Sequence, residues 1–381
     1  MREKKICVVV TFFTNGQPGF LDFSYRIRCL AANYELVVVS RHRLTQAELS
    51  FPGVRYIVVE QAESRLGWLR YLWRAAAVIR KESPAVAVLL HSLASPVALL
   101  IGKTPVALYW NEHPTHVAPD ERGVSPPKAL LRRVVRGLLF RGAREANLIM
   151  PIGEAHRDDL LARGCAPART RMIYMGVDNS FDLGAPATPC EDRPLRLIYV
   201  GSVQRDRGRD VMLEAMAMLS RGPKVAHLTI VGASEEQLAY CREYVEQAGI
   251  EDIVTVRGRV PGREIPGFFA QADAGICLWE DWPWYRFNPP TKLFEYLVAG
   301  LPVLASDIRT HTEYVKDGAN GLVFDYGGAG LATAIQRLWV MRERLPQLKA
   351  AARQSSLPYR WDAIEPEFLA AVDGLAQGAA A

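Results

Sequence analysis

The stretch PTKLFEYLVAGLPVLASD, from Pro290 to Asp307, predicts a helix that leads into a buried strand. A proline at the first turn opens the helix, apolar residues recur at helical spacing up to Gly300, and an apolar strand pattern follows. Lys292 and Glu295 fall in the first turns, where free backbone N–H groups and the helix dipole favour an anion. We therefore expect a phosphate-bearing ligand there, with its sugar hydroxyls bonded to the carboxylate. The alternative is a surface helix with an ordinary lysine and glutamate.

The composition is that of a globular protein with two domains. The chain has 381 residues, which exceeds one typical core, and 49% of them are apolar. A formal charge of +5 suits an anionic substrate or a membrane surface, and no nucleic-acid-binding motif occurs. Six scattered cysteines without metal-ligand spacing predict reduced, mostly buried thiols of a cytoplasmic protein. Neither a signal peptide nor a membrane span is predicted.

The first half alternates short apolar runs with helical patterns, which predicts a doubly wound parallel sheet. In this fold class, ligands bind beyond the carboxyl ends of the strands. The loop that contains Gly16 follows the first strand, and Glu112 and His113 follow another, so we expect all three at the ligand edge. For His113 a structural role is an equal alternative, and His91 is a weaker candidate. Strands are expected at 6–10, 35–40, 54–59, 106–110 and 147–151, and a helix at about 21–32.

Two segments of this half combine apolar and basic residues at helical spacing. In RLGWLRYLWRAAAVIRK (65–81), Trp68 and Trp73 belong to an apolar stripe bordered by arginines. The segment 128–144 places Arg132, Arg133 and Arg136 beside a second stripe and contains no acidic residue. Such helices are typical of the lipid headgroup layer, so we predict that these five side chains contact an anionic membrane surface. The alternative is a pair of sheet-packing helices whose arginines extend into solvent.

The second half restarts the same pattern after a Pro-, Ala- and acid-rich linker. A strand at 195–200 runs into GSVQRDRG, where Gly201, Ser202, Arg205 and Arg207 precede a helix. Free N–H groups and guanidinium groups in such a turn suit a diphosphate, although the spacing matches neither a nicotinamide fingerprint nor a P-loop. Further strands of this half are expected at 227–231, 253–257 and 274–278, and an aromatic loop, WEDWPWYRFNPP, precedes the helix at 290. Before the linker, the stretch 171–181 is expected to close the first domain with a strand, which leads into a glycine turn at Gly176.

Five segments together resemble the family-4 retaining glycosyltransferases of the GT-B fold. They occur in the family's order as IYMGVDNSF, GSVQRDRGRDVMLEAM, VRGRVPGREIPGFFAQADAGICLW, PTKLFEYLVAGLPVLASD and EYVKDGANGLVF. The resemblance spans most of the chain. It implies two Rossmann-like domains that face each other across a cleft, with a nucleotide-sugar donor held mainly by the second. The predicted parts are a first domain at 1–183, a linker at 184–194, a second domain at 195–356, and a final helix at 357–381 that packs back on the first domain.

The resemblance also implies roles for individual residues. Glu295 matches a glutamate that binds the donor ribose, and Arg207 matches a basic residue that binds the donor diphosphate. A first-domain glycine loop near the diphosphate corresponds to Gly16 or Gly19. The predicted catalytic residues are Glu112, His113, Arg207 and Lys292. The predicted donor-binding residues are Gly16, Gly201, Ser202, Arg205, Arg207, Asn288, Thr291, Lys292, Leu293 and Glu295.

Two positions depart from the family pattern. Phe287 stands where the first of a pair of glutamates normally contacts the donor sugar, and Glu280, Asp281 or Asn288 are the candidates to replace it. Ser202 stands where an arginine is common, which leaves diphosphate binding to the arginines of the same loop.

The resemblance implies an enzyme that transfers a hexose, with retention, from a UDP- or GDP-linked sugar to a lipid-linked or oligosaccharide acceptor. Its setting would be bacterial-type surface polysaccharide or glycolipid synthesis, on the inner face of the cell membrane, without nucleic acid. Neither a cofactor nor a metal is expected, because basic side chains and helix N-termini would stabilise the leaving diphosphate. The alternatives are a nucleotide-sugar 2-epimerase on the same fold and a non-catalytic sugar- or lipid-binding scaffold.

Overall fold

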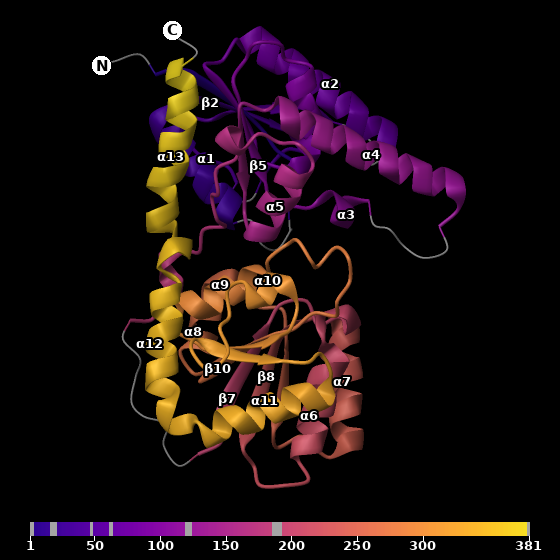
Figure 1. Ribbon diagram of the computed structural model, residues 1–381, viewed down its shortest axis with the longest axis vertical. Helices are drawn as coiled ribbons and strands as arrows, with labels where there is room; N and C mark the ends of the chain where they lie inside the picture. The colour runs from indigo at the N-terminus through magenta and orange to yellow at the C-terminus, as the bar shows by residue number, and fades with distance from the viewer. Residues whose placement is uncertain are drawn as a thin grey trace. The chain divides into compact units, whose positions relative to one another are not determined.

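The chain divides into two compact units, each built on a parallel sheet (Figure 1). The computed structural model describes residues 4–15, 21–45, 49–60, 64–118, 124–184 and 193–378. Unit 1 comprises Met1–Gly176 and Trp361–Ala381, and unit 2 comprises Val177–Arg360. The predicted α/β class with two Rossmann-like domains is confirmed. Unit 2 begins before the predicted linker because Val177 pairs with Arg360, and most of the linker lies outside the described residues.

The sheet of unit 1 has six parallel strands in the order β3-β2-β1-β4-β5-β6. Its central strands are buried on both faces, as their continuous apolar runs predict: Val8 and Val9 are fully buried on opposite sides of the sheet. The strands are β1 (Ile6–Val10), β2 (Glu35–Ser40), β3 (Arg55–Val58), β4 (Val86–Leu89), β5 (Val106–Trp110) and β6 (Leu148–Pro151).

Helices cover both faces of this sheet. The helices α1 (Leu21–Asn33) and α13 (Trp361–Gly378) pack on one face and on each other, as Figure 1 shows. On the other face α2 (Arg65–Glu82) and α4 (Pro126–Glu145) both contact the 3₁₀ helix η1 (Ser92–Leu99). The remaining elements are α3 (Pro114–Val117), α5 (Glu154–Ala162) and the 3₁₀ turn η2 (Pro167–Arg169).

The sheet of unit 2 also has six parallel strands, in the order β12-β11-β10-β7-β8-β9. Both sheets therefore have the strand order of dinucleotide-binding folds, and the order reverses between β7 and β10 in unit 2. Ligands bind at such a switch point, beyond the carboxyl ends of the two strands. The strands are β7 (Leu195–Val200), β8 (Ala226–Ala233), β9 (Val254–Gly258), β10 (Ala274–Cys277), β11 (Val303–Ser306) and β12 (Gly321–Phe324).

Helices α6, α7, α11 and α12 form the main core of unit 2 with one face of its sheet. On the other face Phe269 of α8 contacts Tyr296 of α9, with ring centroids 5.0 Å apart. The helices are α6 (Arg209–Leu219), α7 (Glu235–Ala248), α8 (Ile265–Phe269), α9 (Thr291–Val298), α10 (Arg309–Thr312), α11 (Gly328–Val340) and α12 (Leu345–Ser355), with 3₁₀ turns η3 (Asn179–Phe181), η4 (Arg205–Arg207), η5 (Gly262–Glu264), η6 (Arg342–Arg344) and η7 (Leu357–Tyr359).

The stretch from Pro290 to Asp307 folds as predicted, into α9 followed by β11. One detail differs, because Pro290 is the N-cap residue and the helix starts at Thr291. A second prediction is wrong: the segment 171–175 is not a strand. The N–H groups of Arg171 and Ile173 donate to β6, but the isolated bridge to this strand is formed by Thr170, just before the segment, so no continuous ladder results.

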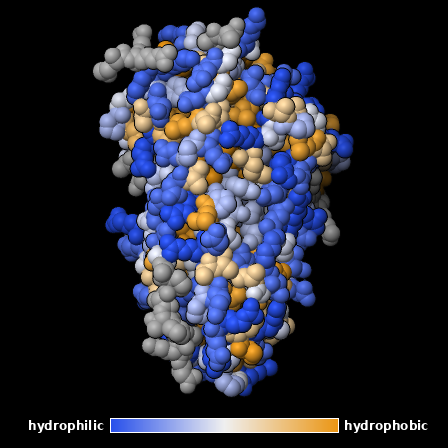
Figure 2. Space-filling view, turned by 60° about the vertical axis from the view of Figure 1, so that its left-hand side comes forward, coloured by the Kyte–Doolittle hydropathy of each residue, from blue (hydrophilic) through white to orange (hydrophobic). Residues whose placement is uncertain are grey.

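Hydrophilic residues cover most of the face seen in Figure 2, with smaller hydrophobic areas between them. Within the described part of the chain, no helix is long and apolar enough to span a bilayer. The five described cysteines are buried and unpaired, as the sequence predicts, and Cys190 lies outside the described residues.

Candidate functional site

The predicted donor site lies at the switch point of the unit 2 sheet. The chain leaves β7 and turns at Gly201, whose φ of +132° strongly favours glycine. A Cβ atom on Gly201 would lie 2.9 Å from Nζ of Lys292, in the first turn of α9. Two motifs far apart in the sequence therefore meet here, and the positive φ of Gly201 is the feature that favours glycine at this turn.

Lys292 is a buried lysine in the first turn of α9. Its side chain is 8% exposed, and Nζ lies 3.8 Å from the ring centroid of Tyr199 and has no acceptor among the described residues. Burial lowers the pKa of Lys292 to about 7, and the nearby Arg207 guanidinium acts in the same direction. A buried ammonium group without an acceptor is costly, and an anionic ligand would supply the missing interactions.

Arg207 is held beside Lys292 by aromatic side chains. Its guanidinium carbon lies 5.6 Å from the ring centroid of Trp279 and 5.8 Å from that of Tyr285, and its Nε is buried without a described acceptor. The Tyr285 hydroxyl donates to Asp206 over 2.6 Å, which joins the aromatic loop to the arginine loop. Arg205, in contrast, is 86% exposed and only approaches a carboxylate at 4.0 Å. Arg207 is therefore the positioned cation of this loop.

Glu295 lies one turn after Lys292 on α9 and is partly exposed. Its carboxylate makes no hydrogen bond or ion pair with any described residue. Burial raises the pKa of Glu295 to about 7, and the positive charge of Lys292 opposes this shift. The arrangement leaves a carboxylate free to accept hydrogen bonds from ligand hydroxyl groups.

The other residues predicted to bind the donor differ in their exposure and in the contacts that they already make. Ser202 is half-buried in the turn after β7, and Thr291 is exposed at the start of α9. Leu293 is fully buried, so its side chain cannot reach a ligand. Its N–H already donates to the Pro290 carbonyl within the first turn of the helix. Asn288 is half-buried and already interacts with other residues. Gly16 lies outside the described residues.

The predicted replacements for the carboxylate missing at Phe287 also differ. Asp281 is occupied, because both of its oxygens accept hydrogen bonds from Arg286 at 2.7 and 2.8 Å. Glu280 is half-buried and forms no hydrogen bond or ion pair through its carboxylate within the described part of the chain. Among these candidates Glu280 is therefore the one whose carboxylate is not already engaged.

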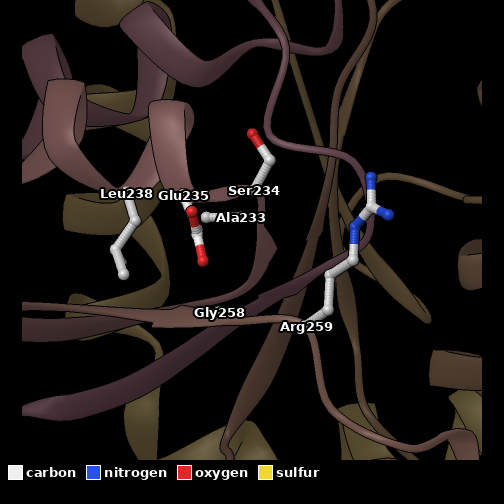
Figure 3. Close-up of a pocket in the computed structure, with 6 residues that line it drawn as sticks. All are labelled: Ala233, Ser234, Glu235, Leu238, Gly258 and Arg259. Carbon is white, nitrogen blue, oxygen red and sulfur yellow. The ribbon is translucent and has the colours of Figure 1, made fainter.

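A cavity of about 340 Å³ at the carboxyl ends of β8 and β9 was missed by sequence reasoning. Figure 3 shows Ser234 and Glu235 at the start of α7, and Arg259 just after β9. The cavity is close to the donor loop, because a Cβ atom on Gly232 of β8 would lie 2.4 Å from the carbonyl oxygen of Gly201. The strand-end rule that located Gly201 could also have located this cavity. It is lined by Ala233, Ser234, Glu235, Leu238, Gly258 and Arg259.

In unit 1, Glu112 follows β5 and lies between two histidines. Its oxygens contact Nε2 of His91 at 3.2 Å and Nδ1 of His116. Burial alone would raise the pKa of Glu112, but the hydrogen bonds with His116 and His91 outweigh it and lower that pKa. Sequence reasoning included Glu112 and His91 and missed His116, which lies one turn after Glu112. The three side chains form a polar cluster at the carboxyl edge of the sheet.

His113 has partners at both ring nitrogens. Nδ1 accepts from the Thr115 N–H at 3.2 Å as the N-cap of α3, and Nε2 contacts Oδ2 of Asp159 at 3.0 Å. Burial lowers the pKa of His113, and Asp159 partly offsets this shift. A neutral ring with both nitrogens engaged has no free position for proton transfer in this arrangement, which favours the structural role.

The residues predicted to contact a membrane do not share one environment. Trp68 is half-buried against the core of unit 1, and its Nε1 donates to the Leu93 carbonyl over 3.2 Å. Trp73 is 60% exposed on the same helix. On α4, Arg133 is exposed and Arg132 and Arg136 are half-buried.

Two family models match the chain. Residues 25–176 match the Glycosyl transferase 4-like domain, and residues 194–340 match Glycosyl transferases group 1.

Among curated proteins, the chain is similar to the amylovoran biosynthesis glycosyltransferase AmsK of Erwinia amylovora, with 25% identity over 192 residues, 49% of this chain and 46% of AmsK. It is also similar to the alpha-D-kanosaminyltransferase of Streptomyces kanamyceticus, with 22% identity over 253 residues, 63% of this chain and 61% of that protein. The matched region thus spans about half the length of these relatives. The crystal structure of Anabaena HepE with UDP-glucose has a TM-score of 0.71 at 16% identity, over 97% of this chain and 100% of HepE, which shows a shared fold.

Proposed function

We propose that this chain, in which a glycosyltransferase 4-like domain precedes a glycosyltransferase group 1 domain, is a retaining hexosyltransferase that uses a nucleotide sugar. The observation that carries the proposal is the group of Lys292, Arg207 and Glu295 at the switch point, whose polar atoms lack partners within the described residues. The similarity to AmsK supports a role in bacterial surface polysaccharide synthesis. The UDP-glucose in the HepE structure supports a UDP-linked donor, with GDP as the alternative.

In this proposal each part of the donor has a place in unit 2. Lys292 and Arg207 bind the diphosphate, and Glu295 accepts hydrogen bonds from the ribose hydroxyl groups. The cavity at the ends of β8 and β9 takes the base. Glu280 takes the role of the carboxylate that is missing at Phe287 and contacts the hexose.

Transfer breaks the bond between the anomeric carbon and the diphosphate oxygen, and the acceptor oxygen bonds to the same face of that carbon. The acceptor's proton goes to the leaving diphosphate. Negative charge grows on the diphosphate as the bond breaks, so Lys292 and Arg207 stabilise the transition state more than the bound donor. We propose that these groups act without a metal, and the test is turnover in the presence of EDTA.

The proposed acceptor is lipid-linked or an oligosaccharide, and exposed apolar residues beside basic ones support binding to an anionic membrane. Leu66 and Trp73 of α2 are 80% and 60% exposed, and Leu130 and Val134 of α4 are 62% and 57% exposed. Arg132 lies between the last two in the sequence. Flotation with anionic vesicles at low salt should recover the protein, and Trp73→Ser with Leu130→Ser should weaken binding. No flotation at low salt would contradict membrane binding.

Titration with UDP and GDP, followed by a screen of nucleotide sugars with and without acceptor, tests the enzymatic proposal. We expect one of the two nucleotides to bind. The Glu295→Ala variant should weaken that binding, and the Arg205→Ala variant should not. An epimerised nucleotide sugar formed without acceptor would favour the epimerase. If neither nucleotide binds and Glu295→Ala changes nothing in cells, the chain is a scaffold and the proposal fails.

A further inference from the structure

A second cavity, of about 430 Å³, lies within unit 1 and is strongly basic. Arg133, Arg136 and Arg144 of α4 line it, together with Arg163, which directly follows α5. His113, the N-cap of α3, also lines it. The volume falls in the range of about 300–1,000 Å³ that is typical of small-molecule sites.

The spacing along α4 explains how one helix supplies most of this wall. Positions 133, 136, 137, 140 and 144 follow the helical period, so their side chains share one face. Phe140 is buried at the base of the face, and the Arg163 guanidinium lies 4.2 Å from its ring centroid. A Cβ atom on Gly137 would meet nothing within 4 Å. The absence of a side chain at Gly137 therefore keeps the space between the arginines open.

Among the described residues that line the cavity, basic side chains are present and carboxylates are not. Asp159 is the carboxylate that contacts its wall, and it accepts from Nε of Arg163 at 2.8 Å and from His113 at 3.0 Å. Neither Arg133 nor Arg144 forms an ion pair with any carboxylate in the described part of the chain. Like charges that face one open space repel one another, and a bound anion would reverse the sign of that interaction.

We propose that this cavity of unit 1 binds a phosphate or diphosphate group through residues that do not belong to the donor group of unit 2. Planar guanidinium groups on two elements, α4 and the end of α5, match the oxygens of a phosphate. Anion binding here does not depend on the proposed function. Its assignment to the phosphate of a lipid-linked acceptor does rest on that function.

Calorimetric titration of the full chain with pyrophosphate tests the site. The Arg144→Gln variant should weaken the cavity site by about tenfold or more, because it removes a charge-assisted hydrogen bond. The Gly137→Leu variant should abolish that site without changing any charge, and its melting temperature should not fall because the new side chain enters open space. The matched control is Arg141→Gln, which removes an exposed charge from the same helix outside the cavity and should change affinity less than twofold.

Equal weakening by Arg141→Gln and Arg144→Gln would mean general electrostatic attraction and would overturn the proposal. Unchanged binding in a folded Gly137→Leu variant would also overturn it. The Lys292→Met variant should leave this site intact. If Lys292→Met leaves UDP binding unchanged as well, the proposed function fails while the cavity site stands.

Three probes identify the source of the phosphate. Pyrophosphate represents a free anion, farnesyl diphosphate in detergent represents a lipid-linked diphosphate, and phosphatidylglycerol vesicles represent a membrane headgroup. We expect the Arg144→Gln variant to lose most affinity for farnesyl diphosphate. A larger loss for vesicles or for pyrophosphate would support the site and assign it to that source instead. No effect of the variant on any of the three probes would contradict the proposal.

Discussion

Lys292 in unit 2 and His113 in unit 1 are both buried, titratable side chains near the carboxyl edge of a parallel sheet, yet their surroundings differ. Nζ of Lys292 has no hydrogen-bond acceptor within the described residues, whereas both ring nitrogens of His113 are engaged. Position in the fold is therefore not enough to identify a functional residue. A buried polar group that lacks partners stays costly until a ligand binds, whereas one with partners already stabilises the fold.

The largest effect is expected at Lys292. The Lys292→Met variant should lower kcat/KM for sugar transfer about 10²- to 10³-fold, because it removes a charge that stabilises the leaving diphosphate. Its free energy of unfolding should not fall, since the substitution removes a buried, unpartnered ammonium group. Steady-state kinetics and thermal unfolding measure the two quantities. The control is Arg205→Gln, which removes an exposed charge from the donor loop. Full activity of Lys292→Met would show that Lys292, like His113, has no direct part in donor binding.

At Glu295 a smaller loss is expected. The Glu295→Gln variant should weaken UDP binding by about 1.5–3 kcal/mol, because the ribose would lose a charge-assisted hydrogen bond. Pyrophosphate binding at the donor site should change little, since it lacks the ribose. Calorimetry with both ligands checks this, with Asp281→Asn as the control. Equal weakening of both ligands would mean that Glu295 acts on the diphosphate instead.

For His113 we expect an effect on stability and not on the donor. The His113→Ala variant removes the contact with Asp159, which keeps its hydrogen bond from Arg163, and leaves the Thr115 N–H without its side-chain acceptor, so the free energy of unfolding should fall by about 1–3 kcal/mol. The Kd for UDP should stay the same. Denaturant unfolding measures the free energy of unfolding, and UDP titration measures the Kd. A large fall in kcat with unchanged stability would instead make His113 catalytic.

The smallest effect is an exchange of protons when UDP binds. Burial lowers the pKa of Lys292 to about 7, so the amine is mostly neutral at pH 8, and a bound diphosphate would raise that pKa and cause uptake of up to about one proton. Burial raises the pKa of Glu295 to about 7, so at pH 6 hydrogen bonds from the ribose would favour its ionised form and cause release. Calorimetry in buffers with different ionisation enthalpies shows whether protons are taken up or released on UDP binding at each pH. Absence of uptake at pH 8 would show that Lys292 does not contact the diphosphate.

Local sequence patterns were sufficient to predict most helices and strands. They failed where pairing with a neighbouring strand decides whether a segment becomes a strand. The apolar runs predicted the strands of both sheets, because a buried parallel strand has to be apolar on both faces. The segment 171–175 has a similar run, but it meets β6 only through two N–H bonds, from Arg171 and Ile173, and the isolated bridge lies just before it at Thr170. Whether a segment becomes a strand depends on a neighbour that the local sequence does not specify.

The sequence by itself determined the class of the fold, the helix that starts at Thr291, and the residue types that suit a diphosphate and a ribose. These follow from periodicity and from the chemistry of single side chains, which are local properties. The tertiary structure decided which of those side chains have partners. Within the described part of the chain it left the charged groups of Lys292 and Glu295 without a hydrogen bond, engaged His113 and Asp281, and placed four arginines around an open Gly137. Partners come from distant segments, so burial and pairing emerge only when the chain has folded.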